Sequence, residues 1–378
     1  MENTSKVKNI FVILNSSTNK LGMSGSDKIY IKLSDEIQNK GIQYHFLTNP
    51  DGFRMISNSS SKKFDFKLIN NVSVVSENFF KGYFLRLIFS YKILFCKLPK
   101  NSVIVASSDF LTDTIPLFLL FLKYGRRNNY FTSMFLRKEL PKNPSISDLI
   151  YKFSQKITIF ITKFSKFKIF TNKIDINYLK NNGIKSSMIK VLPGGINLIN
   201  LTSKKKYDAC FIGRIHPQKG IPVLLRIWKK YTQLNPQAKL AFICSGNKLE
   251  VQNLKKQIKK LDLQPNIKFF GFLDNLDKLQ VLANSQMLLF PSSYESFGIT
   301  VLEALSLKVP VVSFNLEAIK INYKYGVLIS KNEKEFLNNI LKLSDDFKLR
   351  ETLGSLGYKT SLAFTWKKIA AQFLNDLV

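Results

Sequence analysis

The stretch that decides the fold is FPSSYESFGITVLEALSLKVPVVSF, from Phe290 to Phe314. Met287 to Phe290 form a short apolar run that ends at Pro291 and two serines, as a buried parallel strand does. After a loop, the mostly apolar run from Ile299 to Leu307 predicts a helix packed against a sheet. Val309 to Val312 then predict the next strand, so the stretch indicates a parallel α/β sheet.

Two glutamates in this stretch are not required for packing. Glu295 lies in the loop, whereas Glu303 lies about five residues into the helix, roughly 7 Å along its axis from the start. The helix start between them offers unpaired N–H groups that favour phosphate. Two carboxylates separated in this way can hold an elongated ligand at two points. The alternative is that Glu295 is a solvated loop residue and Glu303 a charge on the open side of a helix.

Glu295, Phe297, Gly298 and Glu303 resemble the paired-glutamate motif of retaining glycosyltransferases of the GT-B fold, in particular glycosyltransferase family 4, of the group 1 type. The resemblance extends beyond this motif, from about Tyr207 to Phe314. YDACFIGRIHPQKGIPVLLRIWKKY resembles the first strand, turn and helix of the family's donor-binding domain, and FFGFLDNLDKLQVLANSQMLLFPS leads into the glutamates as the family does.

This resemblance implies an α/β fold of the GT-B type, in which two Rossmann-like domains have parallel sheets facing across a cleft. A chain of 378 residues independently suits two domains. The expected domains are an acceptor-side domain at 1–193 joined by a C-terminal helix at 360–378, a linker at 194–206, and a nucleotide-sugar-binding domain at 207–359.

A turn at Arg214 to Gly220 is the second candidate site segment. Arg214 and Lys219 lie at a helix start, where two cations and N–H donors together suit a pyrophosphate. Spacing alone leaves open that they are simply two of 57 basic residues. By resemblance, both residues neutralise the leaving pyrophosphate and Glu295 faces the donor sugar, which makes these three the expected catalytic residues.

The same resemblance implies a set of donor-binding residues. Glu303 is expected to bind the ribose hydroxyls, and the loop after the first strand is expected to lie across from the pyrophosphate, with a flexible turn as the alternative. The expected donor-binding residues are Gly22, Phe297, Gly298, Ile299, Thr300 and Glu303.

The histidines and cysteines indicate whether a metal site is expected and in which cellular compartment the protein resides. The chain has two histidines, His45 and His216, and no Asp-x-Asp, which disfavours a metal site, so we expect neither a metal nor a cofactor besides the nucleotide sugar. Three cysteines without a C-x-x-C pair indicate buried thiols in a reducing compartment. The N-terminus lacks a signal-like apolar run, so a cytoplasmic location is expected.

The net charge of +31 predicts an anionic partner, with a general compositional bias as the alternative. Residues 77–100 and 142–190 interleave basic and aromatic residues, which is typical of helices on an anionic membrane surface. The alternative is that these helices cover a sheet while their lysines reach solvent. Because no recognition motif accompanies the charge, we expect no nucleic acid.

The expected function is metal-independent transfer of a sugar, often a hexose, from a UDP- or GDP-sugar to a hydroxyl of a saccharide or lipid-linked saccharide, with retention. Cell-envelope polysaccharide or lipopolysaccharide synthesis is the expected context, with the protein cytoplasmic and peripheral on the inner membrane face. Many relatives carry a histidine near Phe135, and this chain does not. The alternative is therefore a catalytically degenerate nucleotide-sugar or glycan-binding protein of the same fold.

Overall fold

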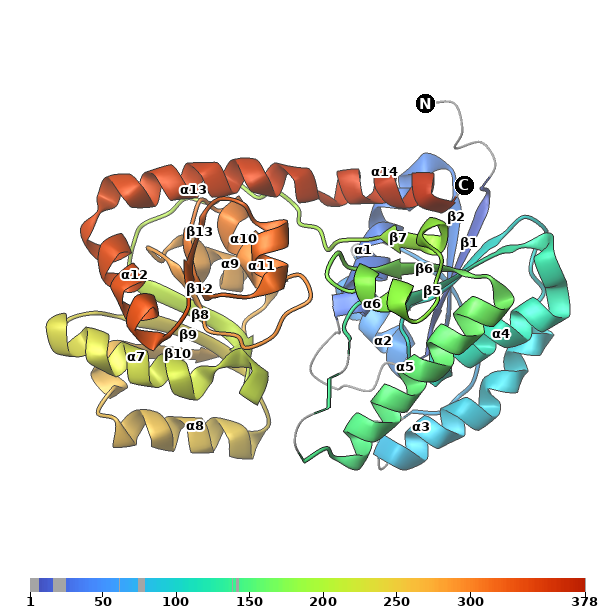
Figure 1. Cartoon of the computed structure of the whole chain (residues 1–378), viewed down its shortest axis with the longest axis horizontal. Helices are drawn as coiled ribbons and strands as arrows, with labels where there is room; N and C mark the ends of the chain where they lie inside the picture. Colours follow the sequence, from blue (N-terminus) through green and yellow to red (C-terminus); the bar gives the residue numbers. More distant parts are fainter. Residues whose placement is uncertain are drawn as a thin grey trace. The chain divides into compact units, whose positions relative to one another are not determined.

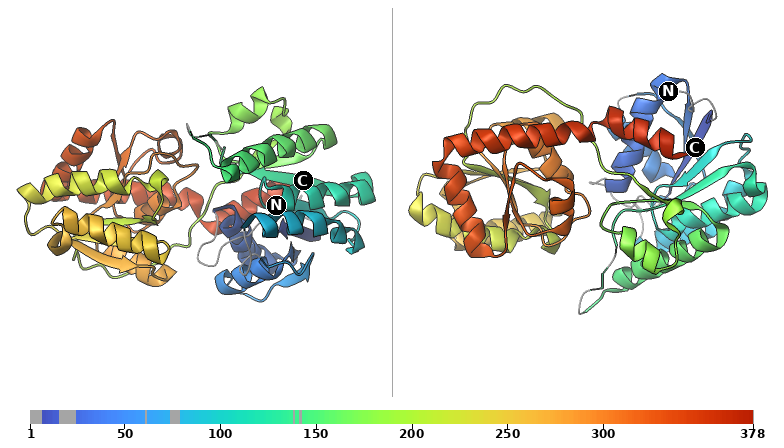
Figure 2. Two further views of the ribbon diagram at one scale, coloured as in Figure 1. Left: turned by 90° about the horizontal axis from the view of Figure 1, so that it is seen from below. Right: turned by 45° about the horizontal axis from the view of Figure 1, so that its top comes forward.

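The computed structural model describes residues 7–15, 25–60, 62–73, 79–137, 139–140 and 143–377 (Figure 1). These residues form two compact units. Unit 1 contains the described residues up to Gly194 and those from Trp366 onward, and unit 2 is Gly195–Thr365. Each unit is a parallel sheet with helices packed on it, as Figure 2 shows from two further directions.

Unit 1 has a seven-stranded sheet in the order β3-β2-β1-β4-β5-β6-β7, and every neighbouring pair is parallel. Its strands are β1 (Asn9–Leu14), β2 (Gln43–Thr48), β3 (Asp65–Leu68), β4 (Val103–Ala106), β5 (Asn129–Met134), β6 (Lys168–Thr171) and β7 (Ile189–Val191). Its helices are α1 (Gly25–Ile37), α2 (Pro50–Ser59), α3 (Phe79–Ile88), α4 (Leu111–Tyr124), α5 (Ile146–Ser165), α6 (Ile176–Asn181) and α14 (Trp366–Leu377), and the 3₁₀ helix η3 (Phe89–Phe95) follows α3. The strand order reverses between β1 and β4.

Burial explains this order. The central strand β4, with the sequence VIVA, is buried along its whole length, whereas the edge strand β3, DFKL, is exposed along its whole length. Parallel strands covered on both faces are apolar at successive positions, and edge strands need not be. At the other end of the chain, the Phe373 ring of α14 lies 6.2 Å from Tyr30 and 5.2 Å from Phe170, which ties α14 into unit 1.

Unit 2 has a six-stranded parallel sheet in the order β10-β9-β8-β11-β12-β13. Its strands are β8 (Ala209–Arg214), β9 (Leu240–Ser245), β10 (Ile267–Gly271), β11 (Leu288–Phe290), β12 (Val311–Phe314) and β13 (Val327–Ser330). Its helices are α7 (Ile221–Leu234), α8 (Lys248–Lys260), α9 (Asn275–Ala283), α10 (Ile299–Ser306), α11 (Glu317–Asn322), α12 (Glu333–Asp345) and α13 (Phe347–Ser361), and the 3₁₀ helix η6 (Pro217–Lys219) precedes α7. Alternate residues of the strands pack with α7, α8 and α12 in one core cluster that includes Trp228, Phe242 and Phe336.

The predicted fold class is confirmed: the chain is α/β with two Rossmann-like parallel sheets. The decisive stretch forms β11, α10 and β12 in the predicted order. The boundary between the units falls at Gly194 and Gly195, at the start of the predicted linker.

Two details of the sequence prediction are wrong. Residues 77–100 do not form one helix, because α3 ends at Ile88, η3 follows to Phe95, and the chain then runs to β4 without a helix. Arg86, one of the basic residues of that segment, is not on the surface but almost fully buried.

Within the described ranges, none of the helices combines the length and the apolar character needed to cross a membrane.

Candidate functional site

The candidate residues of unit 2 follow the two strands at which the strand order reverses. β9 and β10 extend from one side of β8, and β11, β12 and β13 from the other. Ligands of open α/β sheets bind beyond the carboxyl ends of the strands at such a reversal. Arg214 ends β8 and the chain then runs to Gly220, and the segment after β11 contains Pro291 to Gly298. The sheet thus brings together two segments about 76 residues apart in sequence.

Gly220 fixes the distance between these two loops. Its φ is +65°, and a Cβ at this position would lie 2.1 Å from the carbonyl oxygen of Pro291. Only glycine fits so close to another backbone at a left-handed φ. The Ser293 N–H also donates to the Gln218 carbonyl at 2.9 Å, and Gln218 Nε2 donates to the Tyr294 carbonyl at 2.6 Å. The loops are therefore held together by backbone contacts before any ligand binds.

Lys219 and Glu295 form an ion pair across these loops. Ser292 Oγ donates to the same Glu295 oxygen at 3.1 Å, and Lys219 Nζ lies 5.9 Å from the centroid of the Phe290 ring. The two side chains are 19% and 13% exposed, so a ligand can reach the pair. An ammonium so placed can exchange its carboxylate partner for a phosphate, since both are anionic oxygen acceptors.

Arg214 is the last residue of β8, in register with Ser245 of β9. Its side chain is exposed, and it forms no ion pair with any of the described residues. Its guanidinium can therefore bind an anion at the carboxyl edge of the sheet without first breaking an internal ion pair.

Helix α10 starts at a second left-handed glycine. Gly298 has a φ of +81°, and a Cβ here would lie 2.8 Å from Ile319 Cδ1. Phe297 is buried with its ring centroid 5.6 Å from Tyr323 and 5.4 Å from Phe364, and Tyr323 Oη donates to the Gly298 carbonyl at 3.2 Å. Burial, with smaller contributions from the nearby glutamates, raises the pKa of Tyr323 well above its usual value, so the phenol stays a neutral donor.

Glu303 lies on α10 and is buried. The alternative that it is a charge on the open side of a helix is therefore wrong. Lys278 of α9 donates from Nζ to Glu303 Oε1 at 2.9 Å. Sequence reasoning missed Lys278, since the pairing joins two helices 25 residues apart and no local pattern marks it. A carboxylate can accept several hydrogen bonds, so Glu303 has the chemistry to bind a diol.

The structure therefore gathers eight of the nine predicted residues at the carboxyl ends of β8 and β11 or at the adjoining start of α10. Ile299 and Thr300 are the first two residues of that helix and are partly buried. Gly22 lies outside the described residues. Within the described ranges, no three side chains of His, Cys, Asp or Glu come together as metal ligands, and the three cysteine thiols are buried and unpaired.

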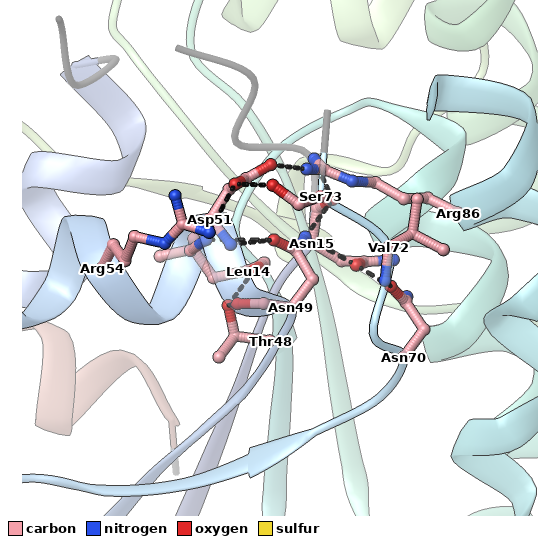
Figure 3. A network of polar contacts seen from close by, with 11 residues as sticks. Leu14, Asn15, Thr48, Asn49, Asp51, Arg54, Asn70, Val72, Ser73 and Arg86 are labelled. Carbon is pink, nitrogen blue, oxygen red and sulfur yellow. Dashed lines mark hydrogen bonds and ion pairs between the residues drawn. The ribbon is translucent and has the colours of Figure 1, made fainter. Parts of the chain in front are cut away.

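A buried polar network occupies the corresponding edge of unit 1, where its strand order reverses (Figure 3). Asn15 directly follows β1 and is fully buried. Asn49 Nδ2 donates to the Asn15 carbonyl at 2.9 Å and to its Oδ1 at 2.8 Å, and Asn70 Nδ2 donates to the same Oδ1 at 3.1 Å. Arg86 Nη1 donates to the Asn15 carbonyl at 3.2 Å. These bonds fix the chain where it leaves β1.

An ion pair explains why Arg86 is buried. It forms an ion pair with Asp51, the two side chains are 1% and 3% exposed, and Ser73 Oγ donates to the same carboxylate at 2.6 Å. Burial lowers the pKa of Arg86, and the Asp51 charge opposes that shift. A charge buried this deeply is retained only with such a partner. Arg86 is therefore a structural residue of unit 1 and does not contribute to its surface charge.

Two aspartates follow β4 at the same edge. Asp113 accepts hydrogen bonds from the Asn15 N–H at 2.7 Å and from Ser108 Oγ at 2.5 Å. Asp109 Oδ2 accepts from Gln155 Nε2 at 2.6 Å, and burial raises the pKa of Asp109 to about 7. Sequence reasoning did not predict that Asp109 is a buried titratable group. The signal that it missed is the position of Asp109 in a Ser-Ser-Asp run directly after a buried strand.

Comparison with known proteins shows what this chain is similar to. Residues 198–360, all of them in unit 2, match the family model described as "Glycosyl transferases group 1". The solved structures similar to this chain are GT-B glycosyltransferases. TarM of Staphylococcus aureus, in complex with UDP and saccharide ligands, has a TM-score of 0.76 at 12% identity and covers 98% of this chain and 100% of TarM. A sucrose-phosphate synthase from Thermosynechococcus elongatus has a TM-score of 0.73 at 15% identity, with 97% of both chains covered. At these identities the likeness shows a shared fold.

Curated relatives point to the same class. An uncharacterised glycosyltransferase of Methanocaldococcus jannaschii is 29% identical over 289 residues, which are 66% of this chain and 68% of that protein. The O-antigen chain mannosyltransferase B of Escherichia coli is 26% identical over 44% of each chain. The capsular polysaccharide biosynthesis glycosyltransferase CapM of Staphylococcus aureus is 26% identical over 56% of this chain and 52% of its own. This chain thus spans about half the length of the latter two. These findings support a group 1 glycosyltransferase.

Proposed function

We propose that the protein transfers a sugar from a UDP- or GDP-sugar to a hydroxyl of a saccharide or lipid-linked saccharide, with retention at the anomeric carbon, as a member of glycosyltransferase family 4. One observation carries this proposal. At the strand-order reversal of unit 2, Lys219 and Glu295 meet beside a glycine-initiated helix that also carries the buried Glu303. This arrangement offers cations and N–H groups to a pyrophosphate and carboxylates to sugar hydroxyls.

Each residue has a role in this proposal. Arg214 and Lys219 neutralise the charge that develops on the leaving pyrophosphate, and no metal is needed for that task. When the pyrophosphate binds, Lys219 exchanges its carboxylate partner for phosphate, and Glu295 becomes available to the donor sugar. The start of α10 at Gly298 to Thr300 provides N–H groups toward the phosphates. Glu303, held by Lys278, accepts hydrogen bonds from the ribose hydroxyls.

We place this activity in cell-envelope polysaccharide or lipopolysaccharide synthesis at the cytoplasmic face of the membrane. Support comes from relatives named for O-antigen and capsular polysaccharide synthesis, from the net charge of +31 and from the buried free thiols. Besides the donor and the acceptor, the proposal requires no cofactor. The other candidate, a binding protein without chemistry, is favoured by the phenylalanine at 135, near which many relatives carry a histidine.

The first test measures thermal stabilisation by UDP, GDP, ADP and their sugars. A ligand at a hundred times its dissociation constant stabilises the folded protein by about 2.7 kcal/mol. One nucleotide should stabilise the wild type and the control Glu351→Ala, an exposed glutamate of α13, but not Glu303→Ala. If none of these nucleotides has an effect, the proposed donor site is wrong.

The second test measures transfer with product detection. Arg214→Ala should lower the rate by about two orders of magnitude or more, as the loss of a preorganised charge stabiliser does. The control is Arg226→Ala, which removes an exposed arginine of α7 that pairs with Glu333. An Arg214→Ala rate equal to wild type would refute the assignment. A wild type that binds nucleotide but forms no product with any acceptor would favour the binding protein.

A further inference from the structure

Helix α5 has apolar residues on both its inner and its outer side. The side that packs into unit 1 is rich in polar residues, which find hydrogen-bond partners there. Thr158 Oγ1 lies 3.0 Å from Thr114 Oγ1, Thr162 Oγ1 lies 2.8 Å from Thr132 Oγ1, and Gln155 bonds Asp109. A helix that covers a sheet ordinarily turns its apolar stripe inward. The burial of α5 is therefore partly achieved with polar groups, and five of its large apolar residues lie elsewhere.

These residues are on the outer side. Five large apolar side chains of α5 are between 47% and 70% exposed, and their spacing of three, four, seven and four residues keeps them on one stripe. We call them the α5 outer face: Ile146, Leu149, Phe153, Phe160 and Phe164. The Phe160 and Phe164 rings stack on each other, with centroids 6.1 Å apart. Few monomeric proteins leave a contiguous aromatic stripe in water without a use for it.

A second exposed row lies on the adjoining helices. It consists of Phe84 and Ile88 of α3 with Tyr91 and Phe95 of η3, between 48% and 75% exposed. Tyr83 of α3 contacts α5 directly, because its Oη lies 3.0 Å from Ser154 Oγ. Figure 1 shows α3 and α5 as neighbours within unit 1. The two rows therefore belong to neighbouring elements.

The charges beside both rows are mostly positive. Lys156, Lys163 and Lys166 are exposed along α5 and at its end, and Lys92 and Lys97 are exposed beside the second row. The sequence has no acidic residue from Lys81 to Lys100 and none from Leu149 to Ile174. Asp148 in the first turn of α5 is the one acidic residue within that helix, and it takes part in the helix cap with Ser145. An apolar stripe flanked mainly by cations is complementary to a surface with an apolar interior and anionic groups above it.

We propose that the α5 outer face, with the row on α3 and η3, docks unit 1 on an anionic lipid bilayer. The aromatic rings enter the boundary between headgroups and acyl chains, and the lysines contact the headgroups. A second copy of the chain fits this surface less well, because two-fold pairing would set the lysines of one copy against the same lysines of the other. The inference goes beyond the transferase activity and does not depend on it.

The experiment is co-sedimentation of the full-length protein with vesicles of phosphatidylcholine alone or mixed with phosphatidylglycerol. Binding should require the anionic lipid and weaken with added salt. Phe160→Ser with Phe164→Ser should lower the partition coefficient at least about tenfold, because two aromatic rings no longer become buried in the bilayer. Lys156→Ala with Lys163→Ala should lower it by about fivefold per lysine.

Matched controls come from unit 2. Phe272→Ser with Phe347→Ser removes two phenylalanines that are 73% and 66% exposed, and Lys256→Ala with Lys260→Ala removes two exposed lysines of α8. Both control proteins should bind vesicles as the wild type does. Since Phe160 and Phe164 are exposed, their double variant should melt as the wild type does and keep its stabilisation by nucleotide, which separates this inference from the proposed donor site.

Three results would overturn the inference. The first is no binding to the anionic vesicles, and the second is an equal loss of binding in the unit 2 controls, which would show that binding is not specific to the α5 outer face. The third is a dimer in light scattering that Phe160→Ser with Phe164→Ser abolishes, which would assign the face to a second copy of the chain.

Discussion

Replacing Gly220 by alanine tests whether the contact between the two site loops positions the candidate residues. The added Cβ would lie 2.1 Å from the Pro291 carbonyl oxygen and 2.9 Å from the carbonyl carbon, and real Cβ atoms essentially never approach within 3.0 Å. The loop with Lys219 and the loop with Glu295 must therefore separate by about 1 Å, in addition to the strain of a left-handed alanine.

The chain offers a matched control for that strain. Gly271 has a φ of +72°, close to the +65° of Gly220, but nothing lies within 4 Å of the Cβ that alanine would add. Gly271→Ala should therefore cost only the left-handed conformation, about 1–2 kcal/mol. Gly220→Ala should cost the same plus about 1–3 kcal/mol for overpacking against Pro291. The difference between the two variants isolates the contact between the loops.

Unfolding in urea, followed by tryptophan fluorescence, measures both values. The chain has two tryptophans, the buried Trp228 in unit 2 and Trp366 in unit 1. In a Trp366→Phe background the signal therefore reports unit 2 alone. We expect Gly220→Ala also to lose stabilisation by nucleotide, and Gly271→Ala to keep it. If the two variants lose equal stability and both bind nucleotide, the loop contact does not organise the site.

Three further predictions concern buried charges. Asp109 has an ordinary pKa of 3.8 and a folded pKa of about 7, so the folded state holds the proton more tightly, and its contribution to stability is full below pH 3.8 and is lost as pH rises through 7. Asp109→Asn should flatten that fall in the free energy of unfolding, measured in a Trp228→Phe background, and an unchanged pH profile would contradict the assignment. Lys278→Met should destabilise unit 2 by about 3 kcal/mol or more, because it leaves the Glu303 carboxylate buried without its cation. Adding Glu303→Gln should restore part of that loss in urea unfolding, and additive losses would show that the two residues do not interact. Arg86→Met should cost unit 1 about 3–5 kcal/mol, with partial recovery on adding Asp51→Asn. A cost below about 1 kcal/mol would be that of a surface pair and would refute the buried role of Arg86.

Local patterns were sufficient to predict the fold and much of the candidate site. The apolar run before Pro291, the glycine at 298 and the two glutamates eight positions apart are all visible within one short segment. The same is true of Arg214 and Lys219 at the end of a strand. The strand-order reversal then brings the two segments together, which follows from the topology once the parallel sheet has been recognised.

Contacts between distant segments could not be predicted in the same way. Arg86 and Lys278 each pair with a carboxylate far along the chain, and in the sequence both look like ordinary surface cations. The threonines at 158 and 162 have buried partners that belong to other elements. A polar side chain can face the core only where another element provides a hydrogen-bond partner. The spacing of residues along one helix does not show whether such a partner exists.

The return of the chain to unit 1 has a consequence for its biosynthesis. Phe373 of α14 packs against Tyr30 and Phe170, so the core of unit 1 lacks this ring until the last helix has been translated. At about 5–20 residues per second, the roughly 180 residues after Gly194 take on the order of 10 to 40 s to synthesise. Unit 2 is one uninterrupted segment and can finish folding earlier. The first half of the chain to leave the ribosome is therefore the second to be completed, and until then it exposes aromatic surface that chaperones can bind.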